Sequence, residues 1–395
     1  MFPLKRKRLV VAIVLLIIGA ALVYLLFAPV PIVPAAWTPP TAPTLTGQYE
    51  RNTLLSPVEK LSVGDGHKPE DVALDTQGRI YAGLEDGRIM QLQPDGTQPR
   101  LFANTQGRPL GMVFDRAGNL IVADAIKGLL SVNPAGDIKV LATEADGVKF
   151  GCLNDLDIGA DGTIYFSEAS YKYPMSQFTN DVLEHQPNGR LMALDPQTLK
   201  PRTLLRGIYF ANGVAVSPDQ TFVLVAETGR YRIRRYWLKE PKQGMDDTFI
   251  DNLPGFPDGI SSNGTDKFWL ALVTPRQALF DRMLPHPFLR KIVYRMPKAM
   301  QPAPERYSFV IALNPAGRVV QNLQNGSSDC YAQIANVLER DGKLYFGSIG
   351  EDTVGRFSLS SVPDTKKTPV YLCTKRTSAG STKNLSKRIG LTGGG

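Results

Sequence analysis

A β-hairpin pattern that recurs six times is the feature that most restricts how this chain can fold. Each copy has a short apolar run, a tight turn that contains Gly or Asp, and a second apolar or aromatic run, as in DLDIGADGTIYFSE and VLERDGKLYFGS. Runs of this kind around such turns are typical of β-hairpins. Several copies continue into a third strand and a further turn, as in GRIMQLQPDG, so each repeat predicts a meander of about four strands.

The spacing of the repeats predicts a closed ring of blades. The hairpin turns lie at residues 78, 118, 162, 220, 264 and 342, and no long helix or Gly-rich phosphate loop is expected between them. Repeats of this length with four short strands are typical of β-propellers. We therefore predict an all-β fold, a six-bladed β-propeller over residues 49–362, in which residues 49–63 donate a strand that closes the ring. The longest interval contains an insertion, residues 274–306, rich in basic and large apolar side chains.

An uninterrupted apolar segment, residues 9–28, directly follows the basic residues 5–8. A helix of this length spans about 30 Å, the thickness of the hydrocarbon core of a bilayer. A cleaved secretory signal is the alternative, although its apolar region is shorter and residues 34–36 match a cleavage site only weakly. Because basic flanks stay in the cytoplasm, residues 1–8 predict a cytoplasmic N-terminus. The chain is then a single-pass type II membrane protein with an N-terminal transmembrane helix as signal anchor, and its propeller is periplasmic, lumenal or extracellular.

Two segments of biased composition flank the predicted propeller. Residues 29–48 contain repeated Pro and predict an extended linker, and residues 363–395, basic and ending in glycines, predict a flexible tail. The excess of basic residues behind the net charge of +8 lies in this tail and in residues 5–8. A nucleic-acid-binding protein carries its basic stripe on the folded domain, so this distribution argues against nucleic acid as a partner. The three Cys are too few and too widely spaced for a disulfide framework.

Oxygen-bearing side chains recur at one position of the repeat. Counting back from each turn to the start of the first strand gives two carboxylates, two carboxamides and two apolar residues: Glu70, Leu110, Asn154, Asn212, Asp258 and Ile334. In a ring of blades, these equivalent positions converge on the axis. Two carboxylates close together are costly without a counter-ion, and an all-oxygen set without His or Cys favours Ca²⁺, with coordination positions left for water or substrate. The alternative is that each Asn or Asp only shapes the turn before its strand.

Five stretches resemble the strictosidine synthase-like family, above all its membrane-anchored branch: GRPLGMVFD (107–115), VADAIKGLL (122–130), NDLDIGADGTIYFSEAS (154–170), NGVAVSPDQTFVLVAETGRYRIRRYWL (212–238) and LPGFPDGI (253–260). The resemblance covers about residues 55–360 and the N-terminal anchor. It implies a six-bladed propeller with calcium on its axis, as in the related gluconolactonases and paraoxonases. The metal-binding Glu, two Asn and Asp of those relatives match Glu70, Asn154, Asn212 and Asp258, the same set that the repeat position predicts.

Two departures from the family pattern narrow the expected reaction. Strictosidine synthases use a Glu of the last blade in an amine–aldehyde condensation, and Ala332 stands at the corresponding place, so condensation is disfavoured. Paraoxonases have a His where this chain has Leu110, which argues against a His-dyad mechanism. What remains is a calcium-dependent hydrolase of small hydrophobic esters or lactones, of the arylesterase or lactonase type. Calcium would polarise the carbonyl and activate water, and Asp258, or Glu70, would accept the proton. The alternative is a non-catalytic propeller, stabilised by calcium, that binds protein or lipid partners.

Several residues near the predicted ligands allow two interpretations. Asp71 and Asp155 directly follow two ligands and resemble the pair that binds a second calcium in paraoxonases, and a turn or ion pair at the strand start is the alternative. His67 could relay protons at the channel mouth, or be an ordinary loop residue. His185 is expected on a hairpin loop. The insertion 274–306 could close over the metal as an apolar lid, or lie on the membrane surface.

Overall fold

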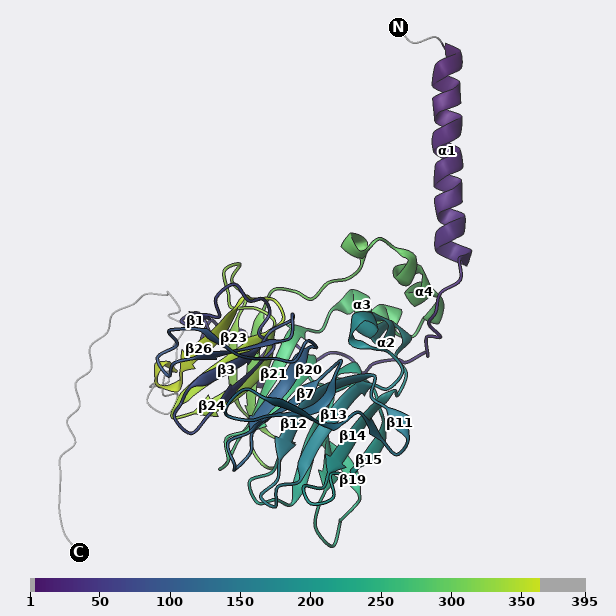
Figure 1. Cartoon of the computed structure of the whole chain (residues 1–395). Helices are drawn as coiled ribbons and strands as arrows, with labels where there is room; N and C mark the ends of the chain where they lie inside the picture. The colour runs from purple at the N-terminus through teal and green to yellow at the C-terminus, as the bar shows by residue number, and fades with distance from the viewer. Residues whose placement is uncertain (1–3, 363–395) are drawn as a thin grey trace, which may run out of the picture. The chain divides into compact units, whose positions relative to one another are not determined.

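The computed structural model describes residues 4–362, and Figure 1 shows their strands gathered in one body. The predicted tail, residues 363–395, lies outside the described residues. Six four-stranded antiparallel sheets form the blades, and five of them are built from strands that follow one another along the chain. The predicted fold, a six-bladed β-propeller with an N-terminal apolar helix, is confirmed.

The blades contain the following strands: β2 (Asp71–Leu74), β3 (Ile80–Gly83), β4 (Arg88–Leu92) and β5 (Arg100–Asn104) in blade 1; β6 (Pro109–Phe114), β7 (Leu120–Asp124), β8 (Gly128–Val132) and β9 (Ile138–Ala142) in blade 2; β12 (Cys152–Ile158), β13 (Ile164–Ser170), β14 (Gly189–Leu194) and β15 (Pro201–Ile208) in blade 3; β16 (Ala211–Val216), β17 (Phe222–Glu227), β18 (Arg232–Trp237) and β19 (Asp246–Ile250) in blade 4; β20 (Gly255–Ser262), β21 (Phe268–Pro275), β22 (Ser308–Leu313) and β23 (Val319–Asn325) in blade 5; β24 (Ile334–Arg340), β25 (Lys343–Ser348), β26 (Thr353–Ser358) and β1 (Glu59–Ser62) in blade 6. The first strands contact their neighbours around the ring, β2 to β6, β12, β16, β20, β24 and back to β2. These six strands therefore line the axis. A short ribbon of β10 (Glu144–Ala145) and β11 (Val148–Lys149) precedes blade 3.

Strand β1 closes the ring, as the sequence predicts. It pairs antiparallel with β26, so the first strand of the chain completes the last blade. Leu61 is buried among apolar side chains of blades 1 and 6. The guanidinium of Arg356 on β26 also pairs with the carboxylate of Glu59 on β1, 2.9 Å away. Closure by the N-terminal strand leaves β26 without a bare edge.

All six predicted hairpin turns have a residue with positive φ at the position counted from the sequence. The values lie between 58° and 86°, and five of these residues are Gly, which adopts this conformation without steric cost. The sixth is Gln220, at φ 58°. Its side-chain oxygen accepts a hydrogen bond from the backbone N–H of Ala160 in the neighbouring blade, 2.7 Å away. At this turn, Gln220 lacks the conformational freedom of Gly but makes a hydrogen bond between blades.

Apolar side chains of facing sheets fill the wedges between blades. Ile121 and Phe166 belong to one buried cluster between blades 2 and 3, and Leu191 and Val225 to another between blades 3 and 4. Burial of such side chains is the main favourable contribution to folding. Because the wedges are filled, the six first strands are fixed relative to one another.

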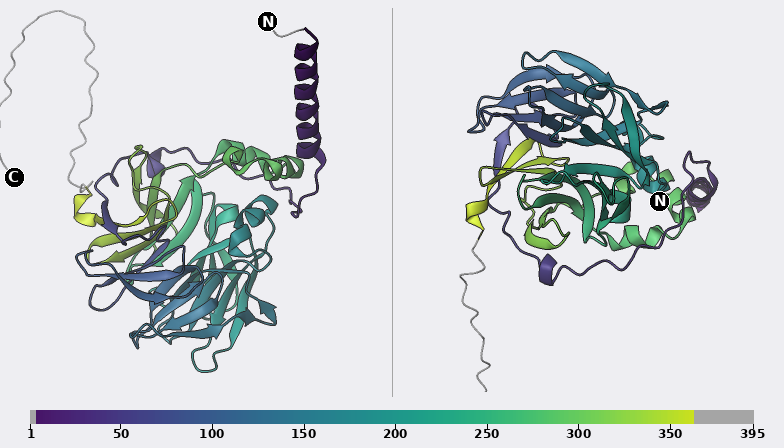
Figure 2. Two further views of the ribbon diagram at one scale, coloured as in Figure 1. Left: turned by 45° about the horizontal axis from the view of Figure 1, so that its top comes forward. Right: turned by 90° about the horizontal axis from the view of Figure 1, so that it is seen from below.

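Two insertions leave the propeller at the end where the first strands begin. The predicted insertion contains α3 (Ala278–Met283) and α4 (Pro287–Arg295), and a second one, after β13, contains α2 (Phe178–Glu184). Each follows a second strand that ends beside the start of a first strand, since Ser170 pairs with Cys152 and Pro275 with Gly255. Helices α2 and α3 both contact α4 beside the ring (Figure 2). Short 3-10 turns lie at Gly47–Tyr49, Met175–Gln177, Thr228–Arg230, Lys298–Met300 and Leu359–Ser361.

Residues 29–46 have neither helix nor strand, but they are packed against the insertions. Ile32 is 1% exposed and joins a cluster with Tyr173, Leu183, Met283 and Val293. The backbone N–H of Ala35 donates to the carbonyl of Glu184, and that of Trp37 to the carbonyl of Leu284. The folded body therefore begins well before Tyr49, where the composition places its start.

Helix α1 (Leu4–Phe27) contains the predicted apolar segment. Its residues 7–27 have a mean hydropathy that reaches 3.2, and the most apolar stretch is not buried inside the protein. The helix is therefore compatible with a membrane anchor. Arg295 of α4 holds its C-terminal end, because Nη1 donates to the carbonyl of Leu25 at 2.7 Å and Nε to that of Ala28 at 2.6 Å.

Candidate functional site

The predicted axial residues lie in irregular stretches of the first strands. Register shifts interrupt the pairing of β6, β12, β16, β20 and β24 near their starts. Asn154, Asn212 and Asp258 lie within such bulges, inside the strands rather than just before them, whereas Glu70 directly precedes β2. A bulge opposes two residues to one and reorients a side chain. The bulges thus release these side chains from the ordinary alternation of the strand.

The structure brings Glu70, Asn212 and Asp258 together. The side chain of Asp258 is buried and hydrogen-bonded to the carboxamide of Asn212. Burial, and after it the charge of Glu70, raises the pKa of Asp258 well above its usual range, against a lowering by the bond from Asn212. Two carboxyl groups thus share one poorly hydrated space, an arrangement that favours a bound cation or a proton.

Asn154 also lies at the start of a first strand, with 8% of its surface exposed. Its carboxamide makes no hydrogen bond to another side chain or to the backbone within residues 4–362. Largely buried carboxamides ordinarily have such partners. An uncommitted carboxamide oxygen is what a metal ligand would require, so Asn154 fits the predicted donor set.

Arg108 is a member of the site that sequence reasoning missed. Its Nη2 lies 2.6 Å from Oε2 of Glu70, and its Nη1 donates to the carbonyl of Lys68 at 3.3 Å. Both side chains of the ion pair are largely buried, with 8% and 13% exposed. The signal was available in GRPLG, where a charged residue precedes an otherwise apolar first strand. Arg108 supplies a positive charge to Glu70, one of the two axial carboxylates.

The donor set fits a hard cation in type but is partly engaged with protein groups. Two carboxylates and two carboxamides supply only oxygen ligands, as Ca²⁺ prefers. Among the described residues, no group of three or more His, Cys, Asp and Glu side chains could hold a metal. The predicted set is of a different kind, because half of its donors are Asn. Arg108 occupies one oxygen of Glu70, so a metal would share this carboxylate with the guanidinium.

The predicted second pair, Asp71 and Asp155, joins neighbouring blades. Asp71 accepts hydrogen bonds from its neighbour Val72 and, at 2.6 Å, from the backbone N–H of Met112 in blade 2. Asp155 accepts one from Val214 in blade 4 at 2.8 Å. Burial raises the pKa of Asp71 to about 7 and, together with the charge of Asp71, raises that of Asp155. These bonds favour the structural interpretation of the pair over a second calcium.

The two histidines singled out by the sequence occupy different surroundings. His67 is 62% exposed and pairs with Asp352 through Nδ1 at 3.1 Å. His185 is not on a hairpin loop but ends α2, with φ 52°. It is 5% exposed, its ring stacks on Trp37 at 4.7 Å, and its Nε2 has no partner within the described chain. Burial, followed by the charges of nearby arginines, lowers the pKa of His185 to about 3.

A small apolar cavity lies between the insertions and the starts of the first strands of blades 4 and 5. It encloses about 40 Å³, and its lining includes His185, Tyr209, Phe210, Thr228, Phe256 and Phe280. Thr228 connects the cavity with the axial residues, since its hydroxyl accepts a bond from Asn212 at 3.3 Å and donates to the carbonyl of Pro257 at 2.7 Å. The cavity is therefore adjacent to the candidate metal ligands.

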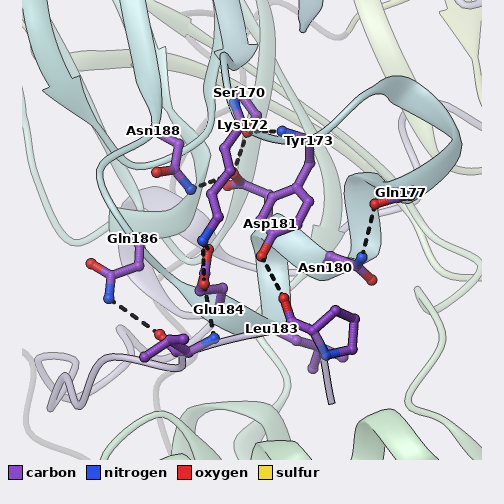
Figure 3. A network of polar contacts seen from close by, with 12 residues as sticks. Ser170, Lys172, Tyr173, Gln177, Asn180, Asp181, Leu183, Glu184, Gln186 and Asn188 are labelled. Atoms are coloured by element: carbon purple, nitrogen blue, oxygen red, sulfur yellow. Dashed lines mark hydrogen bonds and ion pairs between the residues drawn. The ribbon is translucent and has the colours of Figure 1, made fainter. Parts of the chain in front are cut away.

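A polar network fixes the α2 insertion beside this cavity (Figure 3). The hydroxyl of Ser170 donates to Oδ2 of Asp181 at 2.6 Å. Glu184, fully buried, accepts bonds from the ammonium of Lys172 at 2.7 Å and from the backbone N–H of Val33 at 2.8 Å. The N-terminal segment and the insertion are thereby held together at the same end of the ring.

The fold and the axial residues define a six-bladed propeller with an all-oxygen donor set. Comparison with related sequences then identifies the family of the chain. The strictosidine synthase family model matches residues 154–241, and the model of the N-terminal part of strictosidine synthase-like proteins matches residues 47–92. Strictosidine synthase-like 4 of Arabidopsis thaliana is 34% identical over 334 residues, 83% of this chain and 89% of that protein. The chain belongs to the strictosidine synthase-like family.

The chain is also similar to a relative that is named as membrane-associated. The adipocyte plasma membrane-associated protein of Rattus norvegicus is 32% identical over 354 residues, 84% of this chain and 94% of that protein. Solved structures with the same fold include a gluconolactonase from Xanthomonas campestris, 17% identical, with a TM-score of 0.55 over 84% of this chain and 98% of that one. Another is the calcium-binding protein regucalcin from Agrobacterium tumefaciens, 15% identical, with a TM-score of 0.53 over 76% and 93%.

Proposed function

We propose that the protein is a membrane-anchored, calcium-dependent hydrolase of esters or lactones. Glu70, Asn154, Asn212 and Asp258 would hold the ion at the axis. The observation that carries the proposal is the burial of Asp258 beside the charge of Glu70 and the carboxamide of Asn212, at the starts of first strands. When bound, Ca²⁺ would polarise the substrate carbonyl and lower the pKa of water.

Residues of this chain would supply the remaining steps. Asp258, with Glu70 as the alternative, would take the proton from the attacking water. As a ligand of Ca²⁺ this carboxylate would be a weak base, which favours activated substrates. Arg108, already paired with Glu70, would hold that carboxylate in place. The apolar cavity beside Asn212 would receive a small hydrocarbon part of the substrate and exclude water.

The comparisons support a hydrolase in general terms only. Structural relatives named as gluconolactonases share the fold, and a regucalcin named as calcium-binding shares it too. Because their sequence identity to this chain is low, these structures show a shared fold and not a shared reaction. The proposal therefore rests on the axial residues of this chain.

A non-catalytic propeller is the second candidate, and the Arg108–Glu70 ion pair favours it. This pair neutralises one axial carboxylate without any metal, so a calcium ion could serve stability alone. In that case the propeller would bind protein or lipid partners through its rims.

Condensation of the strictosidine type has little support from the last blade. Ala332 is fully buried, and the carboxylate nearest to its backbone N–H is Glu351, whose Oε1 lies 3.2 Å away. Although burial opposes it, hydrogen bonds from Lys60, Ala332 and Arg306 lower the pKa of Glu351. A carboxyl group with a lowered pKa is a weaker general acid than a catalytic Glu requires.

We also propose that α1 spans the membrane with its N-terminus in the cytoplasm. The basic residues before the apolar stretch and its length support this orientation. The propeller would then face the periplasm, a lumen or the extracellular space. Accessibility of an N-terminal and of a propeller-borne tag in sealed vesicles would test it.

The hydrolase proposal is tested by initial rates of the full-length protein in detergent micelles on aryl acetates and on γ- and δ-lactones. The rate should require Ca²⁺, fall in chelator, and drop at least about 100-fold in Asp258→Asn. Asp266→Asn, at the exposed turn of the same blade, is the matched control and should keep the wild-type rate.

Two outcomes would decide between the candidates. Loss of turnover in folded Asp258→Asn, with an unchanged control, would support hydrolysis at the axis. Absence of turnover on every substrate, while Ca²⁺ still raises the melting temperature, would contradict the hydrolase and favour the non-catalytic propeller.

A further inference from the structure

The insertion that carries α3 and α4 exposes several large apolar side chains. Leu279 is 64% exposed, Phe288 51%, Leu289 42% and Met300 64%. They come from α3, the first turn of α4 and the following 3-10 turn. Isolated exposed apolar residues are common, but several within one short segment mark an interaction surface.

Basic residues accompany this apolar group. Arg282, Lys291 and Lys298 lie in the same segment, and no ion pair within residues 4–362 involves any of them. The acidic residue of α3, Asp281, is already paired with Arg276 at 2.8 Å. The segment therefore offers uncompensated positive charge next to apolar side chains, a combination that fits an anionic lipid surface.

The opposite side of α4 ties this segment to the end of α1. Arg290 and Val293 are buried, and Arg290 donates to the carbonyl of Leu183 at 3.0 Å, so α4 is seated on the α2 insertion. Arg295, at the end of α4, donates to the carbonyls of Leu25 and Ala28, where the apolar stretch of α1 ends. The end of a membrane-spanning helix lies at the lipid–water interface.

We infer that residues 278–300 rest on the bilayer that α1 enters, with the exposed apolar side chains at the boundary of the acyl chains and the basic ones among anionic headgroups. Helix α4 is only about 14 Å long at 1.5 Å per residue. Its first turn, with Phe288 and Leu289, therefore cannot lie far from the interface that Arg295 marks. The inference requires that α1 spans the membrane and is independent of the hydrolase proposal.

Fluorescence of the full-length protein in nanodiscs of phosphatidylcholine and phosphatidylserine tests the inference. An environment-sensitive label would be attached to Leu289→Cys in a Cys373→Ser background, since Cys152 and Cys330 are buried. Met245→Cys is the matched control: it is 58% exposed but precedes β19, at the end of the blade opposite to the axial residues. Melting temperatures of the labelled proteins would confirm that they are folded.

The label at 289 should emit at shorter wavelength than the label at 245, and lipids with a nitroxide in the acyl chain should quench it by about half or more. Arg282→Glu combined with Lys298→Glu should reduce this quenching. Equal quenching at 289 and 245 would overturn the inference. The exposed apolar surface would then be interpreted as a binding site for a protein partner. If neither the charge reversal nor the removal of phosphatidylserine changed the quenching at 289, the proposed role of the basic residues would be wrong.

Discussion

Arg108 places a permanent positive charge beside Glu70, and this determines how strongly the axial carboxylates depend on a metal. In Arg108→Met, Glu70 would lose its protein counter-ion while Asp258 stays close to its charge. We expect the variant in chelator to be less stable by about 3–5 kcal/mol, the usual consequence of removing one partner of a buried pair. Added Ca²⁺ should restore more stability to the variant than to the wild type. Urea unfolding in chelator and in calcium measures both effects.

Arg88→Met provides the control for this prediction. Arg88 pairs with Asp65 and Asp86, which are 86% and 49% exposed, and such surface pairs contribute about 0–1 kcal/mol. If Arg108→Met lost no more stability than Arg88→Met, the axial carboxylates would not need the guanidinium.

His185 should make the protein sensitive to acid. The pKa of its imidazole is about 3 in the folded state, against about 6.5 when exposed. The unfolded chain therefore binds a proton first, and stability is lost as the pH falls from about 6.5 toward 3, by about 1.4 kcal/mol per pH unit. Asp181, whose pKa is raised to about 6 by burial, has the opposite slope.

The difference between wild type and His185→Phe isolates the histidine, because Phe keeps a ring between Trp37 and Tyr209. From pH 6.5 to pH 5, the wild type should lose about 1.6 kcal/mol more than the variant. Chemical unfolding at both pH values measures this. Parallel losses would mean that the imidazole is protonated in the folded protein.

The sequence contained the axial residues but not their full surroundings. The repeat position led to Glu70, Asn154, Asn212 and Asp258 because the hairpin turns mark the start of each strand. The bulges could not be located, since they depend on pairing between strands. His185 was misplaced because its surroundings come from residues distant in sequence, such as Trp37 and Tyr209.

At the scale of elements, residues 29–46 form part of the folded body. Ile32→Ala should cost about 2–4 kcal/mol, because Ile32 is 1% exposed among side chains of both insertions. Val33→Ala is the matched control: Val33 is 68% exposed, and the change should stay within about 0.5 kcal/mol. Urea unfolding of the two variants measures the difference, and equal effects would mean that the segment is not docked.

Composition could not show this docking. Repeated Pro correctly excludes helix and strand from residues 29–46. The contacts of Ile32, however, come from Tyr173, Leu183, Met283 and Val293, which lie far along the chain and in two separate insertions. A local sequence pattern cannot indicate packing partners that lie so far away along the chain.

At the scale of the whole molecule, the ring depends on β1. Leu61→Asp would place a charge in the apolar wedge between blades 1 and 6 and detach β1 from β26. Amides of residues 353–358 should then exchange with solvent at least about 10-fold faster. Ser62→Asp, on the exposed side of the same strand, should leave their exchange unchanged. Hydrogen exchange followed by mass spectrometry measures both, and unchanged exchange in Leu61→Asp would mean that β1 does not hold the ring closed.

The architecture was the part of the structure most accessible from the sequence. Turns at Gly78, Gly118, Gly162, Gly264 and Gly342 need positive φ, which marks them as turns, and their spacing fixes the blade number. The insertion after β13, with α2, was not expected from the sequence, whereas the position of the insertion 274–306 near the axial residues was one of its two interpretations.

Ring closure by β1 also sets an order for the synthesis of the protein. Its pairing partner, residues 353–358, is nearly the last part of the described chain to leave the ribosome. At translation rates of about 5–20 residues per second, β1 waits on the order of 15–60 s for that partner. During this time it could pair with β26 of a neighbouring chain instead. A chain that stalls before Thr353 remains an open ring, however well its first five blades have folded.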